Sequence, residues 1–283
     1  MPASIVSTHL ARALALLAPA PPPPGVTRYL GLYAPSFHPH TLVTIDCPSG
    51  HAGEVRLASF ATGLHAPSEL PAHWEDRAVV DEARIEALRR LLDPLALADA
   101  DARVCIDGIA LLGAITAVDG TTSSFEARSP RPGDPSHTWF AALHALAREL
   151  LKQEATQLRL EQLHGYLALG PPLADLGGVP RHLRIFGHLT SDDEPALRDF
   201  FAAAPPGAPV LVDLRNFEGM AGALFPVLRS LDRSPRPVAW FAPDGVQQRL
   251  LAAAVDPSHL FSGLEAARRY LAGKAAGSAP PAE

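Results

Sequence analysis

The stretch Pro209-Val210-Leu211-Val212-Asp213-Leu214 decides the fold class of the C-terminal part of the chain. A short apolar run of this kind, bounded by turn residues, is typical of a strand that is buried on both faces. Pro205-Pro206-Gly207 breaks the chain before it, and a loop over residues 215–220 follows. We therefore expect a central strand in a covered sheet.

Strands and helices alternate on either side of this stretch. We expect strands over residues 183–189, 209–214, 237–241 and 259–261, and helices over residues 194–203, 221–231, 246–255 and 264–271. Such alternation predicts a mainly parallel α/β sheet with right-handed crossovers.

The same part of the chain resembles the STAS domain, the fold of anti-sigma factor antagonists and of the cytoplasmic tails of sulfate transporters. The resemblance rests on Gly187-His188-Leu189-Thr190, Val210–Leu214, Phe217, Met220, Ala242-Pro243 through Val255, Leu260-Phe261 and Leu264–Ala267, which follow the family's order and spacing. It implies a STAS-like α/β domain over residues 181–273 that acts by binding a protein partner.

The chain departs from the antagonists at one decisive place. The family's phosphorylated Ser or Thr at the start of the helix after the loop corresponds here to Ala221-Gly222-Ala223. No Ser, Thr or Tyr occurs from Asp213 to Val227, so phosphorylation cannot switch this site. The resemblance therefore implies a docking surface or an assembly scaffold without the switch.

The partner-binding surface implied by the resemblance comprises the segments 187–191 and 215–222. Its candidate residues are His188, Thr190, Ser191, Asn216, Glu218, Met220 and Gly222. Exposure of Phe217 or Met220 would favour protein docking. The alternative is that both side chains pack beneath the following helix, and the sequence leaves the two interpretations open.

The N-terminal part predicts a different, α+β domain over residues 26–134, and it matches no family that we can name. We expect strands over residues 28–33, 41–47 and 54–60, a helix over residues 78–92, and a hairpin over residues 104–127 that turns at Asp119-Gly120. Asp134-Pro135 is suited to begin the next helix.

Residues 135–168 are helical in pattern and support two hypotheses. In the first, one or two helices pack on the N-terminal domain. In the second, a linker helix forms a homodimer, although its apolar stripe is not a strict heptad. The Pro/Gly-rich residues 169–180 predict a hinge between the two domains.

The two ends of the chain predict little fixed structure. We expect residues 1–25 to be a flexible, Pro-rich segment that includes a short amphipathic helix. Arg12 interrupts the apolar run Leu10–Ala20, which argues against a signal peptide. Residues 274–283 are small and polar, and we expect a disordered tail.

Composition excludes several function classes. The net charge of −6 over 283 residues argues against general nucleic-acid binding, and all of the excess lies in residues 1–179. No run of 18 uncharged apolar residues exists, so we expect no membrane span. Two cysteines cannot build a disulfide framework, and we expect a cytoplasmic protein.

Few side chains in the sequence suggest metal binding or catalysis. His38, His40, Asp46 and His51 form the densest ligand-like cluster, but their spacing matches no metal motif, so we expect surface-loop histidines. Cys47 lacks the sequence context of a nucleophile. We therefore expect no metal and no cofactor.

Roles in turns and in the core explain three further candidates. Asp107-Gly108 and Asp119-Gly120 could offer carboxylates for acid–base work, but turn geometry accounts for both pairs. Cys105, in an apolar strand, is expected to be a small core residue.

Our first functional hypothesis is a non-enzymatic regulatory or scaffold protein of bacterial signalling. It would bind a protein partner, either a kinase-like regulator or an assembly subunit, while the N-terminal domain senses or tethers. The alternatives are a small-molecule or nucleotide-binding sensor, because open α/β sheets bind ligands at the carboxyl ends of their strands, and an immunity-type neutralising protein. An enzyme ranks last.

Overall fold

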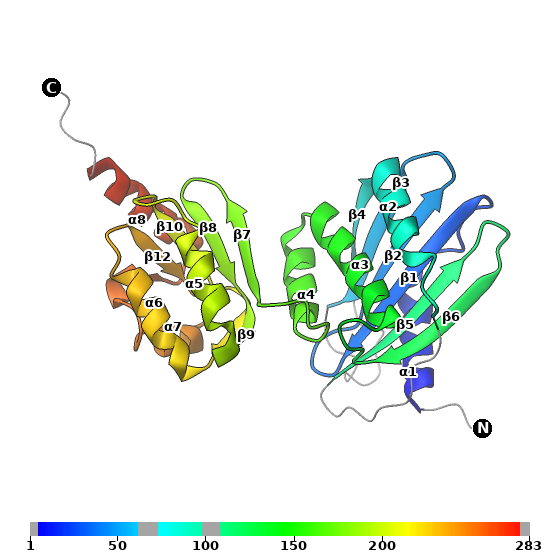
Figure 1. Cartoon of the computed structure of the whole chain (residues 1–283), viewed down its shortest axis with the longest axis horizontal. Helices are drawn as coiled ribbons and strands as arrows, with labels where there is room; N and C mark the ends of the chain where they lie inside the picture. The colour runs from blue at the N-terminus through cyan, green and yellow to red at the C-terminus, as the bar shows by residue number, and fades with distance from the viewer. Residues whose placement is uncertain (1–4, 62–72, 98–107, 278–283) are drawn as a thin grey trace. The chain divides into compact units, whose positions relative to one another are not determined.

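The structure, a computed structural model, describes residues 5–61, 73–97 and 108–277. The chain divides into two compact units, Met1–Leu169 and Gly170–Glu283, and both are mixed α/β structures (Figure 1). Cys105 and Asp107, which the sequence singled out, lie outside the described residues.

The first unit is built on an antiparallel sheet of six strands in the order β4-β3-β2-β1-β5-β6. Its elements are α1 (Ile5–Leu17), β1 (Val26–Pro35), β2 (Thr41–Pro48), β3 (Gly53–Phe60), β4 (His73–Val80), α2 (Glu82–Leu92), β5 (Ile109–Thr116), β6 (Thr122–Arg128), α3 (Pro135–Leu150) and α4 (Glu154–His164). Asp119-Gly120 turns the chain between β5 and β6, as expected.

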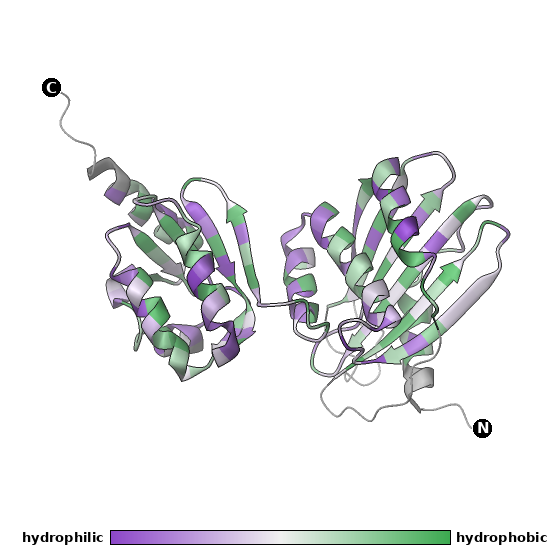
Figure 2. Ribbon diagram, viewed as in Figure 1, coloured by the Kyte–Doolittle hydropathy of each residue, from purple (hydrophilic) through white to green (hydrophobic). Residues whose placement is uncertain are grey.

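Both faces of this sheet are covered, because apolar residues occupy both sides of its central strands. On β1, Tyr29 and Tyr33 contribute to the core beneath α2, α3 and α4, whereas Leu30 and Leu32 contribute to the core beneath α1. Figure 2 shows both hydrophobic and hydrophilic residues on helix α3, and its buried residues include Trp139, Phe140 and Leu143. Helix α3 therefore contributes one apolar side.

The expectation of a flexible segment over residues 1–25 is wrong for helix α1. Leu10, Ala13 and Leu17 are almost fully buried against the sheet, and the Leu17 carbonyl accepts a hydrogen bond of 3.0 Å from Arg56 Nη1. The apolar spacing that suggested an amphipathic helix thus gives this helix a packing role.

The helix expected over residues 78–92 begins later, at Glu82, because residues 73–80 form edge strand β4. Strand β4 was not expected because it carries several charged residues. In the structure Glu75 pairs with Arg56, and Asp76 accepts a hydrogen bond of 2.7 Å from Thr156. Charged side chains are common on edge strands.

The structure argues against the second hypothesis for residues 135–168, a dimerising linker helix, because their apolar stripe is buried within the first unit. The stripe supplies Trp139, Phe140, Leu143, Leu146, Ala147, Leu151, Leu160, Leu163 and Leu167 to the core of that unit. The first hypothesis, one or two helices packed on the N-terminal domain, agrees with the structure, which has two helices there.

The second unit contains a five-stranded sheet in the order β13-β12-β10-β8-β7 and a separate pair, β11-β9. Its elements are β7 (Leu173–Gly177), β8 (Arg181–Ile185), β9 (Gly187–Leu189), α5 (Glu194–Ala202), β10 (Val210–Asp213), β11 (Phe217–Met220), α6 (Phe225–Asp232), β12 (Val238–Phe241), α7 (Gly245–Leu251), β13 (Leu260–Phe261) and α8 (Leu264–Gly277). All neighbours are parallel except β7, which runs antiparallel to β8.

Strand β10, the stretch that opened the sequence argument, is completely buried. Val210 and Val212 belong to the core that α5, α6 and α7 complete, and Leu211 belongs to a smaller core beneath α8. The expected central strand, with both faces covered, is confirmed.

Two boundaries differ from the expectation. Residues 169–180, expected as a hinge, contain strand β7, whose backbone pairs with β8. Helix α8 continues to Gly277 and so includes the first residues of the expected disordered tail, 274–283. In both places small residues and prolines near an element suggested irregular structure, but the backbone still forms regular hydrogen bonds.

Candidate functional site

The structure brings together the two segments that the sequence assigned to one surface. Strands β9 and β11 pair in parallel, with His188 opposite Gly219 and Leu189 opposite Met220. The backbone N–H of Gly187 donates to the Asn216 carbonyl at 2.8 Å, and Ala221 N–H donates to the Leu189 carbonyl at 2.9 Å. Hydrogen bonds at both ends therefore hold the two segments in register.

An irregularity in β11 places two side chains on the outside of this pair. The register shifts between Phe217 and Gly219, so that Glu218 has no residue directly opposite it. Glu218 and His188 are both exposed. Gly219 lies close to the imidazole: a Cβ at this position would lie 3.1 Å from His188 Nδ1, so the exposed ring would have to shift slightly to accept one.

Thr190 and Ser191 lie where β9 ends and helix α5 approaches. The Thr190 N–H and hydroxyl both donate to Asp193 Oδ2, at 2.7 and 2.9 Å, which forms a capping box. Thr190 thus has a structural role in starting the 3-10 turn Ser191–Asp193, which precedes α5. Ser191 is exposed on the same surface.

Phe217 and Met220 could either be exposed for docking or pack beneath the following helix, and the structure differs for the two residues. Phe217 is 3% exposed and belongs to the core, so it packs beneath the helices rather than docking a partner. Met220 packs against the same core but remains half-buried. Asn216 is also half-buried and Gly222 is exposed, so five of the seven candidates present exposed atoms: His188, Thr190, Ser191, Glu218 and Gly222.

An ionic network at the end of β10 was missed by sequence reasoning. The Asp213 carboxylate, at the end of β10, is fully buried. It accepts hydrogen bonds from His182 Nε2 at 3.0 Å and Arg215 Nη2 at 2.7 Å, and Arg184 Nη1 lies 3.5 Å away. Arg215 N–H also donates to Asp213 Oδ1 at 3.1 Å, which fixes the chain as it leaves β10 toward β11.

The network keeps Asp213 ionised. Burial alone would raise the pKa of this carboxyl group, but the hydrogen bonds from His182 and Arg215 outweigh it. The positive charge of Arg184 acts in the same direction, and the pKa of Asp213 lies well below its ordinary range. The alternation of charged and apolar residues in Arg181–Phe186 was the only sequence feature that pointed to it.

The histidine and carboxylate cluster of the N-terminal unit does not converge. His38 Nδ1 lies 3.1 Å from the Tyr166 hydroxyl, whereas His40 packs near Phe60. Asp46 is engaged by Arg28 through two hydrogen bonds of 2.6 and 2.7 Å. Over residues 5–61, 73–97 and 108–277, no three His, Cys, Asp or Glu side chains are grouped to hold a metal ion.

The remaining chemical candidates have structural roles. Burial raises the pKa of the Cys47 thiol to about 12, so the thiol is protonated at neutral pH and unsuited to nucleophilic attack. Asp119 accepts a hydrogen bond of 2.8 Å from Thr121 N–H within the β5–β6 turn. Turn geometry thus accounts for this carboxylate.

No helix in the described part of the chain is long and apolar enough to cross a membrane. Comparisons of the chain with protein-family models, with curated proteins and with solved structures found no match. The arguments for function therefore rest on the chain's own residues.

Proposed function

We propose that the protein is a non-enzymatic, cytoplasmic regulatory or scaffold protein, and that it binds a protein partner through the β9–β11 surface. This surface comprises residues 187–191 and 215–222. The single observation that carries the proposal is the parallel pairing of β9 with β11, which joins two segments far apart in sequence into one exposed surface.

The topology of the second unit supports a STAS-like interpretation. Strands β8, β10, β12 and β13 are parallel, and helices cover both faces. Ala221-Gly222-Ala223 follow β11 directly, and Gly222–Leu224 form a 3-10 turn before α6. In a STAS-like protein with this sequence, partner binding would depend on the shape and charge of the surface and not on phosphorylation.

The test is affinity capture with the full chain from the cells that produce it, followed by quantitative mass spectrometry. Glu218→Arg reverses an exposed charge on the β9–β11 surface, and Met220→Asp places a charge at its half-buried edge. We expect each substitution to reduce capture of the specific partner by at least about tenfold, the effect of roughly 1.4 kcal/mol at an interface.

A matched control separates surface effects from folding. Glu265→Arg makes the same charge reversal on α8, where the Glu265 side chain is 76% exposed and pairs with Arg268. Capture by this variant should equal that of the wild type. The absence of any specific partner, or equal capture by Glu218→Arg and Glu265→Arg, would refute the proposal.

A further inference from the structure

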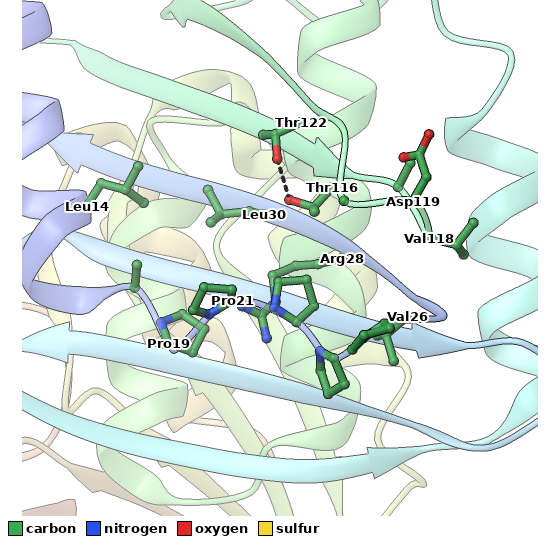
Figure 3. Close-up of a pocket in the computed structure, with 16 residues that line it drawn as sticks. Leu14, Pro19, Pro21, Val26, Arg28, Leu30, Thr116, Val118, Asp119 and Thr122 are labelled. Atoms are coloured by element: carbon green, nitrogen blue, oxygen red, sulfur yellow. Dashed lines mark hydrogen bonds between the residues drawn. The ribbon is translucent and has the colours of Figure 1, made fainter.

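A pocket of about 450 Å³ lies on the α1 side of the first unit's sheet. Residues Pro19–Pro24, which we call the proline strap, form one wall, and Thr116 and Thr122 form part of the opposite wall (Figure 3). Leu30 and Leu14 add aliphatic surface. This size and largely apolar lining match those of small-molecule sites, which typically measure about 300–1,000 Å³.

Two hydrogen bonds hold the proline strap in place, and its backbone supplies mainly hydrogen-bond acceptors. Arg28 Nη1 donates to the Ala20 carbonyl at 2.5 Å, and Val26 N–H donates to the Pro23 carbonyl at 3.2 Å. Ala20 is the only strap residue with a backbone N–H, because the other five are prolines. The strap therefore presents pyrrolidine rings together with carbonyl oxygens.

The polar groups elsewhere in the pocket also select the ligand. The Thr116 and Thr122 hydroxyls lie 3.1 Å apart on paired strands and can each exchange hydrogen bonds with a ligand. Arg28 is neutralised, because its Nε and Nη2 both donate to Asp46. Asp119, which is exposed, is the other charged residue of the lining, so its carboxylate gives the lining a negative charge.

We propose that this pocket binds a small aromatic molecule that carries an N–H or O–H donor and is neutral or cationic. Proline rings pack well on aromatic faces, as in the recognition of proline-rich segments. A ligand donor would meet the strap carbonyls or the threonine hydroxyls. The Asp119 carboxylate favours an amine over a carboxylate on the same ring. An aromatic amine is the best match.

Three probes with one ring system test the charge preference. Binding of tryptamine, indole and indole-3-acetate to the full chain is measured by saturation-transfer NMR and by calorimetric titration. We expect tryptamine to bind at least fivefold more tightly than indole-3-acetate, with indole between them. Asp119→Asn should remove this difference and leave indole binding unchanged, since an Asn side chain can still accept from Thr121 N–H.

Two tryptophan substitutions locate the binding site. Ala18 is exposed and lines the pocket, so Ala18→Trp should fill it and reduce tryptamine binding at least tenfold. Ala15 is equally exposed on α1 but does not line the pocket, and Ala15→Trp should bind as the wild type does. Circular dichroism checks that both variants are folded.

The proposal is overturned if none of the three probes binds, if indole-3-acetate binds as tightly as tryptamine, or if both tryptophan variants bind equally. Equally tight binding of cyclohexylamine and tryptamine would also overturn it, since the ring would then not matter. These outcomes leave the β9–β11 surface untouched, because every residue involved belongs to the first unit.

Discussion

At the scale of single residues, Asp213 is the position where one substitution should do most damage. It is a fully buried charge held by His182, Arg184 and Arg215. Asp213→Asn removes the counter-charge of Arg184 and Arg215, which typically costs about 3–5 kcal/mol. Hydrogen–deuterium exchange of the β10 and β12 amides should report a loss of this size. Asp199→Asn, on the exposed side of α5, should leave the exchange unchanged.

Asp213 should also make the stability of the second unit depend on pH. The folded-state pKa of Asp213 lies below its unfolded value of about 3.9, so the unfolded state binds the proton more readily. The stabilisation is therefore present above about pH 4 and is lost as the pH falls toward the folded-state pKa. Calorimetric unfolding of the second unit should show this loss between about pH 5 and pH 3, and Asp213→Asn should lose less stability over the same interval.

Cys47 offers a second test at this scale. Since burial raises the pKa of its thiol to about 12, we expect iodoacetamide at pH 8 to leave it unmodified in the native protein, and urea to expose it. Peptide mass spectrometry distinguishes Cys47 from Cys105. Rapid alkylation of Cys47 without denaturant would contradict the buried placement.

At the scale of elements, helix α1 should stabilise the first unit. Leu17 is fully buried beneath the sheet, and truncating such a leucine typically costs about 2–5 kcal/mol. Leu17→Ala should therefore increase amide exchange in β1 and β2 by at least about thirtyfold. Arg12→Ala, exposed on the same helix, serves as the control. Equal exchange in the two variants would show that α1 does not hold the sheet.

Most elements followed from local patterns, and the failures have physical causes. Strand β10 and the Asp119-Gly120 hairpin were predicted because apolar runs and turn residues mark them directly. The break between α3 and α4 contains no Gly or Pro. Instead, Gln157 Nε2 donates to the carbonyls of Arg148 and Leu151, which ends α3 through a contact from the next helix. No local pattern encodes such a contact.

The two segments of the candidate site were predictable, but the pairing that joins them was not. The resemblance placed residues 187–191 and 215–222, yet residues 215–220 were expected to be a loop, and only the pairing of β9 with β11 shows that they adjoin. The burial of Phe217 and the capping role of Thr190 depend on neighbours distant in sequence or on backbone geometry. The Asp213 network joins two strands 29 residues apart, beyond the reach of a local pattern.

At the scale of the whole molecule, the two units should fold separately. The chain divides between Leu169 and Gly170, and all strands of each sheet belong to the same unit. We expect residues 1–169 and 170–283, produced as separate fragments, each to give the dispersed NMR spectrum of a folded domain. An unfolded spectrum for either fragment would show that its fold depends on the other unit.

The most direct test of the central claim is site-specific photo-crosslinking of the full chain in the cells that produce it. The crosslinking residue replaces Glu218 on the β9–β11 surface in one variant and Glu265 on α8 in the other, both exposed positions of the second unit. Our account predicts one discrete crosslinked protein from position 218 that position 265 does not yield. No crosslink from position 218, or identical products from both positions, would contradict it.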